Sequence, residues 1–397
     1  MFRISLKMLT GDRIKYVGLV LGTTFTAFLV TFAASYLCGI LTCAFAFVAE
    51  NPGVDVWVMD PAVASVEPAI NLPASALGRV RGVEGVAYAV PLALVSTEAR
   101  LSNGAFIPAQ IIAVDDATLT GVPIGPMGQT ALGLRADRTV FVDAGGTEGK
   151  LVAPVREADR WPKDGTHLNV PTRDLAPGDE IAINDTILRV AGVTHTLARF
   201  PPRPLLYMTY GNALRVLPTE RTRTTFVMAA AAPGVAPRDL AARIESHTGL
   251  RARSAEDFKA DTVRWTLNYS EDVGDMASML IIAAIVGLGG TGVLMFMFTA
   301  DNARNYAVLA TLGTSRWLLV RMVLAQAGLC GLVGTGVGLG TCSLAVKYAV
   351  TAGYPVRMMW PNPLVGAAAV VVVCLVASFI SIRPVLKVQP AMVLASR

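Results

Sequence analysis

The sequence has little charge, few histidines and no catalytic or metal-binding motif. Only 16% of its 397 residues are Asp, Glu, Lys or Arg, whereas soluble domains carry roughly 25%. The three histidines, His167, His195 and His247, lie far apart and show no ligand spacing such as HxxxH. No GxSxG element or Cys/His pair suggests nucleophilic catalysis. We therefore expect no metal site and no catalytic centre, which leaves a self-contained enzyme as a distant alternative.

Cysteine is missing from the longest polar segment, residues 50–275. All five cysteines lie in stretches without Asp, Glu, Lys or Arg: Cys38, Cys43, Cys330, Cys342 and Cys374. A disulfide framework or thiolate metal cluster is therefore excluded in the polar segment. Within the apolar stretches, cysteine behaves as a small hydrophobic residue.

Four uncharged runs dominate what is present: residues 16–49, 276–300, 322–346 and 358–382. A bilayer core of ~30 Å requires ~20 apolar residues in a helix, so each run is long enough to span a membrane. The first run could instead be a signal peptide, because Ala44-Phe45-Ala46 resembles a cleavage site. A signal peptide has an apolar core of only about 7–15 residues, and we therefore predict four spans.

The short flanking segments are basic, which predicts the orientation. They carry ten positive residues, against only Asp12 and Asp301: Arg3, Lys7, Arg13, Lys15, Arg304, Arg316, Arg321, Arg383, Lys387 and Arg397. Residues 50–275 hold 22 Lys/Arg and 27 Asp/Glu. Both termini are therefore expected in the cytoplasm and the large segment outside. The net charge of +5 follows from this topology and indicates no nucleic-acid binding.

These features predict an α-helical membrane protein with four transmembrane helices and a mixed α+β extracytoplasmic domain between helices 1 and 2. The expected segments are an interfacial helix (1–15), the first span and a stalk (16–49), the outer domain with a stalk to the second span (50–275), the second span (276–300), a cytoplasmic coupling helix and loop (301–321), the third span (322–346), a short outer loop (347–357), the fourth span (358–382) and a cytoplasmic tail (383–397).

The outer segment should mix short strands with two helices. Asn184-Asp185, between two strand-like runs, predicts a hairpin turn. Helices are expected over 74–81 and 237–247, and Gly249 follows the second of them. Residues 255–275 are also expected to be helical. The strand-like runs are 54–59, 86–95, 106–114, 139–142, 180–183 and 186–190, and loops are expected at 121–133 and 199–204.

A glycine-rich stretch, residues 144–150 (AGGTEGK), approaches the phosphate-binding loop of nucleotide-binding proteins. Leu151 follows it, where such a loop needs Ser or Thr to reach magnesium. We therefore expect no nucleotide site on this chain.

Glycines in the third span form two pairs separated by four residues, Gly334/Gly338 and Gly336/Gly340. Small residues at this spacing allow close helix packing in membranes. Packing is the simpler interpretation, and a moving helix interface is the alternative.

The segment after the second span has an amphipathic pattern. Tyr306, Leu309 and Leu312 recur at helical spacing with Val308 beside them, and Gly313 can end the helix. Thr314 or Ser315 can then cap the third span. Such a helix is either an interfacial connector or a docking surface for a cytoplasmic partner.

Residues 303–340 (ARNYAVLATLGTSRWLLVRMVLAQAGLCGLVGTGVGLG) resemble the FtsX-like permeases of MacB-type, mechanotransmitting (type VII) ABC systems, particularly DevC-type permeases. Residues 5–9 (SLKML), 175–193 (LAPGDEI through VAGV) and 383–394 also resemble family elements. The chain departs from the family's usual pattern at four places. Asp301, with Arg304 displaced, stands where Glu followed by Arg is usual, and no acidic residue stands at Ala307 or Val308. Gln326 replaces a Glu, and Gln389 replaces an Asp before Pro.

The resemblance implies a non-catalytic membrane subunit of the bacterial inner membrane. Two cytoplasmic ATPase subunits would hold ATP and magnesium, and this chain would bind no cofactor. The resemblance also implies a second permease copy, a periplasmic adaptor, an outer-membrane channel and an amphipathic or lipidic cargo. The expected ATPase-coupling residues are Arg304, Tyr306, Leu309, Leu312 and Gly313. Lipoprotein extraction, as by LolC/LolE-like permeases, and regulation of a cell-wall hydrolase without transport remain alternatives.

Overall fold

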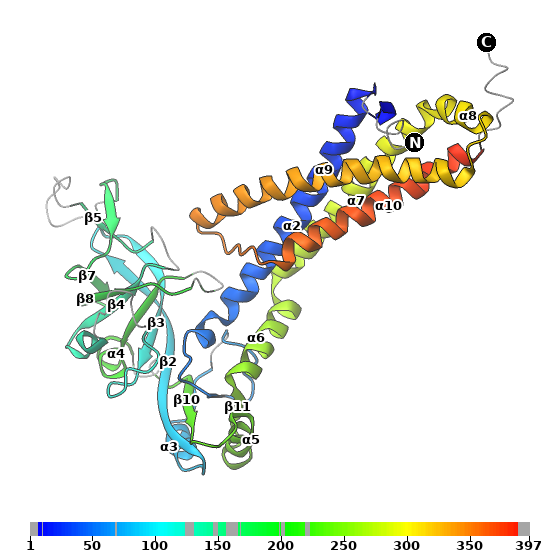
Figure 1. Cartoon of the computed structure of the whole chain (residues 1–397). Coiled ribbons are helices and arrows are strands. Elements are labelled where there is room, and N and C mark those ends of the chain that lie inside the picture. Colours follow the sequence, from blue (N-terminus) through cyan, green and yellow to red (C-terminus); the bar gives the residue numbers. More distant parts are fainter. Residues whose placement is uncertain are drawn as a thin grey trace. The chain divides into compact units, whose positions relative to one another are not determined.

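The computed structural model describes residues 7–9, 11–67, 70–123, 131–145, 150–155, 166, 168–197, 199, 203–218 and 223–387. The expected interfacial helix (1–15), the loops 121–133 and 199–204, the glycine-rich stretch 144–150 and the tail 383–397 lie partly or largely outside the described residues. The chain divides into two compact units, Met1–Ile40 with Glu271–Arg397, and Leu41–Ser270 (Figure 1).

Within the described residues, four helices are long and apolar enough to cross a membrane, as the sequence predicted. They are α2 (Arg13–Ala49), α7 (Glu271–Asp301), α9 (Arg316–Thr351) and α10 (Pro361–Lys387). The 37 residues of α2 correspond to about 55 Å of helix. A bilayer core needs only ~30 Å, so α2 extends well beyond a single span.

Threonines of α2 pack against glycines of the other long helices. Thr23 lies so close to Gly334 of α9 that the position has no room for a side chain. A Cβ at Gly338, one turn further along, would come within 2.7 Å of the Ala27 Cβ. Thr26 meets Gly287 of α7 and Thr31 meets Gly366 of α10 in the same way. Small residues thus bring α2 into close contact with three neighbouring helices.

The unit Leu41–Ser270, called the outer unit below, contains a nine-stranded sheet in the order β11-β1-β10-β2-β3-β9-β4-β8-β7. Its strands are β1 (Val56–Met59), β2 (Val86–Leu101), β3 (Phe106–Val114), β4 (Thr139–Asp143), β7 (Glu180–Ile183), β8 (Thr186–Thr194), β9 (Leu205–Thr209), β10 (Phe226–Ala231) and β11 (Arg251–Ser254). A separate two-stranded sheet joins β5 (Val152–Pro154) to β6 (Thr172–Asp174).

The large sheet has two architectural halves that share β2. Strands β11, β1, β10 and β2, with helices α3 (Ala76–Arg81) and α5 (Pro237–Thr248), follow the β-α-β-β-α-β order of a ferredoxin-like unit. In the other half, β7 pairs with β2 and closes a six-stranded barrel of β2, β3, β9, β4, β8 and β7. Alternate apolar residues of these strands fill the barrel interior. The sequence did not predict this division.

Local sequence patterns located several elements correctly. Strands 106–114 and 180–183 have the predicted bounds. Asn184 and Asp185 adopt positive φ angles of 46° and 62° between β7 and β8, as a tight hairpin requires. Helix α5 ends at Gly249 in the left-handed conformation, with φ of 65°. Strand β2 instead continues six residues past the predicted end, to Leu101, because it pairs with β10 first and with β3 and β7 further along.

The predicted helical character of residues 255–275 is confirmed, with one interruption. Helix α6 (Ala255–Tyr269) ends at Ser270, and α7 begins at Glu271. Ser270 has an extended ψ of 125°. Serine favours the position before a helix, and Glu271 and Asp272 favour its first turn electrostatically. The local sequence therefore starts a new helix here instead of continuing the old one.

Candidate functional site

A short helix, α8 (Ala303–Thr311), connects α7 to α9. The amide and side chain of Asn302 both donate to the Phe298 carbonyl at the end of α7. At the other end, Gly313 adopts a φ of 88° and its amide donates to the Ala310 carbonyl. Gly313 therefore ends the helix as predicted. Ser315 precedes α9, but its side chain makes no capping hydrogen bond.

Helix α8 has a buried face and an exposed face. Tyr306 and Ala307 are 1% and 3% exposed. Arg304, Val308 and Leu312 lie at intervals of four residues on the exposed face, and Leu312 is 77% exposed. This arrangement leaves two apolar side chains and one cation exposed.

The predicted coupling residues are therefore divided between the two faces. Arg304, Leu312 and Gly313 are exposed, Leu309 is half-buried and Tyr306 is buried. Their role in docking an ATPase remains a prediction. Val308, noted in the sequence only as a neighbour, shares the exposed face; the four-residue spacing from Arg304 to Leu312 was the signal that could have selected it.

Tyr306 connects the buried face of α8 to α9 through a hydrogen bond. Its hydroxyl donates a 2.9 Å hydrogen bond to Gln326 Oε1, and both side chains are 1% exposed. Burial raises the pKa of Tyr306 to about 12. Tyr306 belongs to a hydrophobic cluster that includes residues of all four long helices: Leu19, Met295, Phe298, Leu319, Met322, Val323, Val370 and Ala377. The contact fixes which face of α8 is exposed.

An exposed ion-pair cluster links the first turn of α2 to the last turn of α7. Lys15 donates to Asp301 and lies 2.9 Å from Asp12 Oδ2. Asp301 sits at the carboxyl end of α7, where the helix dipole disfavours an anion, so the Lys15 cation compensates it. Because the groups are accessible to water, the cluster orients the helix ends more than it stabilises them.

The four α9 glycines selected from the sequence face different surroundings. Gly334 and Gly338 lie against α2. A Cβ at Gly336 or at Gly340 would have nothing within 4 Å, but only Gly336 of these two lines a groove between α9 and α10. The two pairs therefore lie in distinct environments, and only the 334/338 pair contacts another helix of this chain.

In the outer unit, the last turns of α2 enter a buried aromatic cluster. The Phe47 and Trp57 ring centroids are 5.3 Å apart, and Trp57 lies 5.8 Å from Phe226 and 6.0 Å from Phe258. Phe258 belongs to the first turns of α6. The end of α2 and the start of α6 are thus held by one core, together with β1 and β10.

Two charged side chains, Arg199 and Glu50, lie beside this aromatic cluster. Arg199 is 8% exposed, lies 4.1 Å above the Phe47 ring and donates to the Tyr207 hydroxyl at 3.4 Å. Glu50, directly after α2, accepts a hydrogen bond from the Leu197 amide. Burial raises the pKa of Glu50, and the nearby Arg199 opposes that change. Among the described residues, no group of His, Cys, Asp and Glu could hold a metal ion.

Residues 277–390 match the family model described as the FtsX-like permease C-terminal domain. This range contains α8, α9, α10 and most of α7, and it confirms the resemblance to FtsX-like permeases in this part of the chain. No curated protein matches the chain.

Two solved structures are similar to part of this chain. The periplasmic region of MacB from Actinobacillus actinomycetemcomitans is 15% identical, with 55% of this chain and 94% of that chain covered and a TM-score of 0.33. The extracellular domain of the noncanonic ABC-type transporter YknZ from Gram-positive bacteria is 12% identical, with 51% and 98% covered and a TM-score of 0.31. Identities and TM-scores this low say nothing about function.

Proposed function

We propose that this chain is the permease subunit of an ABC transporter and that it transmits ATP-driven movement from a cytoplasmic ATPase to an outer domain. The carrying observation is that the FtsX-like match encloses α8, a helix with one face locked into the bundle and the other exposed. A connector that only lay on the membrane would need no such hydrogen-bonded support.

The exposed face of α8 is the proposed ATPase contact. Val308 and Leu312 offer an apolar surface, and Arg304 adds a positive charge that an acidic rim on the ATPase would complement. ATP and magnesium belong to the ATPase subunits, of which we expect two. The permease itself binds no cofactor in this proposal and acts without catalytic chemistry.

The route of transmission is the continuous helix α2. Its 37 residues run without interruption, and its last turns end in the aromatic core that also holds the start of α6. Movement of α2 would therefore reach the folded centre of the outer domain instead of a surface loop. The closely packed Thr–Gly contacts would pass movement of α7, α9 and α10 to α2.

The proposed location is the bacterial inner membrane, with both termini in the cytoplasm and the outer domain in the periplasm. The basic flanks support this orientation, and the predicted segment boundaries remain part of the proposal. A second copy of the permease, a periplasmic adaptor and an outer-membrane channel would complete an export system for an amphipathic or lipidic cargo.

The test is purification of the tagged full chain from native membranes in mild detergent, with its partners identified by mass spectrometry. We expect an ABC ATPase together with a periplasmic adaptor. An ATPase with a lipoprotein carrier would replace export by lipoprotein extraction, and an ATPase with a cell-wall hydrolase would replace it by regulation. Recovery of no ATPase from several detergents would contradict the permease assignment.

A further inference from the structure

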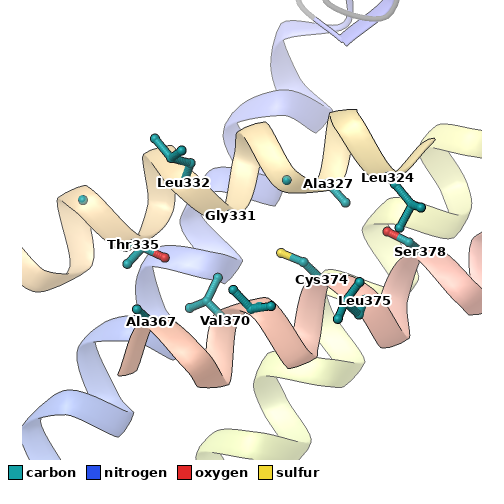
Figure 2. A pocket seen from close by; sticks show the side chains of 13 residues that line it. Leu324, Ala327, Gly331, Leu332, Thr335, Ala367, Val370, Cys374, Leu375 and Ser378 are labelled. Atoms are coloured by element: carbon teal, nitrogen blue, oxygen red, sulfur yellow. The ribbon is translucent and has the colours of Figure 1, made fainter. Parts of the chain in front are cut away.

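An apolar groove of about 520 Å³ runs between α9 and α10 (Figure 2). It begins beside Leu324 and Ser378 and extends to Gly336 and Ala367. Its walls are almost wholly apolar, and no described side chain fills it. A Cβ at Gly328 or Gly336 would meet nothing within 4 Å, so the groove is open where larger residues would close it.

The length and the lining of the groove suit an extended hydrocarbon chain. The lining stretches of α9 (324–336) and α10 (367–378) are each about 17 Å long and almost wholly apolar. A helix of a second copy is the competing occupant, and the experiment below distinguishes it from a lipid.

One end of the groove carries an unsatisfied polar group. The Ser378 hydroxyl is fully buried, lines the groove and has no hydrogen-bond partner among the described residues. Figure 2 shows Ser378 at the same end as Leu324. A buried hydroxyl without a partner is costly, and a carbonyl oxygen on a ligand would accept a hydrogen bond from it.

A cation lies one turn beyond that end. Arg321 precedes Leu324 by three residues and Gly328 by seven, so it lies on the same stripe of α9 as the groove. It is exposed and forms no ion pair within the part of the chain that the structure describes. Its guanidinium stacks 5.4 Å from the centre of the Trp317 ring. Arginine and tryptophan at a helix end are typical of the membrane interface, and guanidinium binds phosphate well.

We propose that the groove holds one membrane phospholipid. Its phosphate would lie at Arg321, an ester carbonyl would accept the Ser378 hydroxyl hydrogen bond, and one acyl chain would run along the groove toward Ala367. Phosphate, ester and chain follow one another in a phospholipid in the same order as Arg321, Ser378 and the apolar groove. Arg321 is one of the flanking residues expected in the cytoplasm, so the phospholipid would belong to the cytoplasmic leaflet. Only this choice of leaflet rests on the proposed function.

The experiment counts phospholipids that remain on the full chain after purification in mild detergent, by native mass spectrometry, and then after exchange with phosphatidylglycerol. Gly328→Leu should fill the groove without a clash, because the position is open. Gly340→Leu is its matched control, away from the groove. Arg321→Gln is paired with Lys347→Gln, which removes an exposed charge at the other end of α9.

We expect one retained phospholipid per chain in the wild type. Gly328→Leu and Arg321→Gln should each weaken retention about tenfold, the effect of losing one good contact, and Ser378→Ala about threefold. Both controls should match the wild type. Thermal stability measured on the same samples separates loss of the lipid from misfolding.

Three results would overturn the proposal. Undiminished retention by Gly328→Leu would show that the groove is not the site. Retention that depends on Arg321 but not on Gly328 would place a headgroup at the interface with no chain in the groove. A change in oligomeric mass in Gly328→Leu, with lipid retained, would make the groove a contact between copies. Recovery of the ATPase is scored separately, so failure here leaves the permease proposal standing.

Discussion

The two ends of α2 are held in different ways. At the first end, Lys15 forms ion pairs that remain accessible to water. At the other end, Phe47 lies in an aromatic core with Trp57, and Arg199 covers its ring. Exposed ion pairs can break and re-form at small cost, whereas a packed aromatic core resists rearrangement. The difference suits the proposed role of α2. In that role the end at Lys15 (the input end) moves, and the end at Phe47 (the output end) carries the outer domain with it.

Removing an aromatic ring from the output end should have the largest effect. Phe258 is fully buried, and Phe258→Ala should destabilise the outer domain by about 3–5 kcal/mol because it leaves a cavity. Amide hydrogen exchange of β1 and β10 in the full chain would measure the loss. Tyr269→Ala, at an exposed position of the same helix, is the control. Equal exchange in both variants would contradict the role of the aromatic core.

Next in size is the hydrogen bond that supports α8. Gln326→Leu leaves the Tyr306 hydroxyl buried without this acceptor and should cost about 1–3 kcal/mol in stability. The double variant Tyr306→Phe/Gln326→Leu removes both polar groups and should recover most of that stability. Transport per ATP hydrolysed should be lower than in the wild type in Gln326→Leu and should remain lower in the double variant, because neither variant has the hydrogen bond that supports α8. If the double variant transported as much per ATP as the wild type, the hydrogen bond would matter for stability alone.

Glu50 should give a smaller, pH-dependent effect. Because burial raises its pKa above the usual 4.5, the folded outer domain favours the protonated carboxyl. The stability that Glu50 contributes is fully present below pH 4.5 and is lost as the pH rises through the raised pKa. Glu50→Gln should therefore unfold at higher temperature than the wild type near pH 7, and the gap should close toward pH 4. A less stable Glu50→Gln at pH 7 would show that attraction to Arg199 outweighs burial.

The smallest effect is expected at the input end. Lys15→Ala removes ion pairs that water already screens, so the melting temperature of the purified chain should not change measurably. Scanning calorimetry of this variant beside Phe258→Ala compares the two ends of α2 directly. If the two variants lowered the melting temperature by similar amounts, the two ends of α2 would not differ in how firmly they are held.

Local patterns predicted the elements that local physics determines. Long uncharged runs gave the four long helices, Asn184-Asp185 gave a hairpin and Gly249 ended α5. The pairing of β7 with β2, which closes the barrel, joins residues about 80 positions apart, and no local pattern encodes it. The interruption at Ser270 lies between two helical patterns, and the sequence analysis did not locate it.

The candidate site was predictable only in part. The spacing of Tyr306, Leu309 and Leu312 identified a helix, and Gly313 its end. Apolar character did not reveal which side chains face inward, because Gln326 on another helix decides it. A tyrosine suits either an exposed contact or a buried hydrogen bond, and only the tertiary partner distinguishes the two.

The most direct test of the account changes the exposed face of α8 and leaves its support intact. Leu312→Glu places a charge on that face, and Thr351→Glu adds one at an exposed position on the far end of α9. ATPase recovered with each variant from membranes is compared at equal amounts of inserted permease. We predict at least about a tenfold loss for Leu312→Glu, the size expected for an apolar contact at an interface centre, and none for Thr351→Glu. Full recovery of the ATPase with Leu312→Glu would contradict docking through α8.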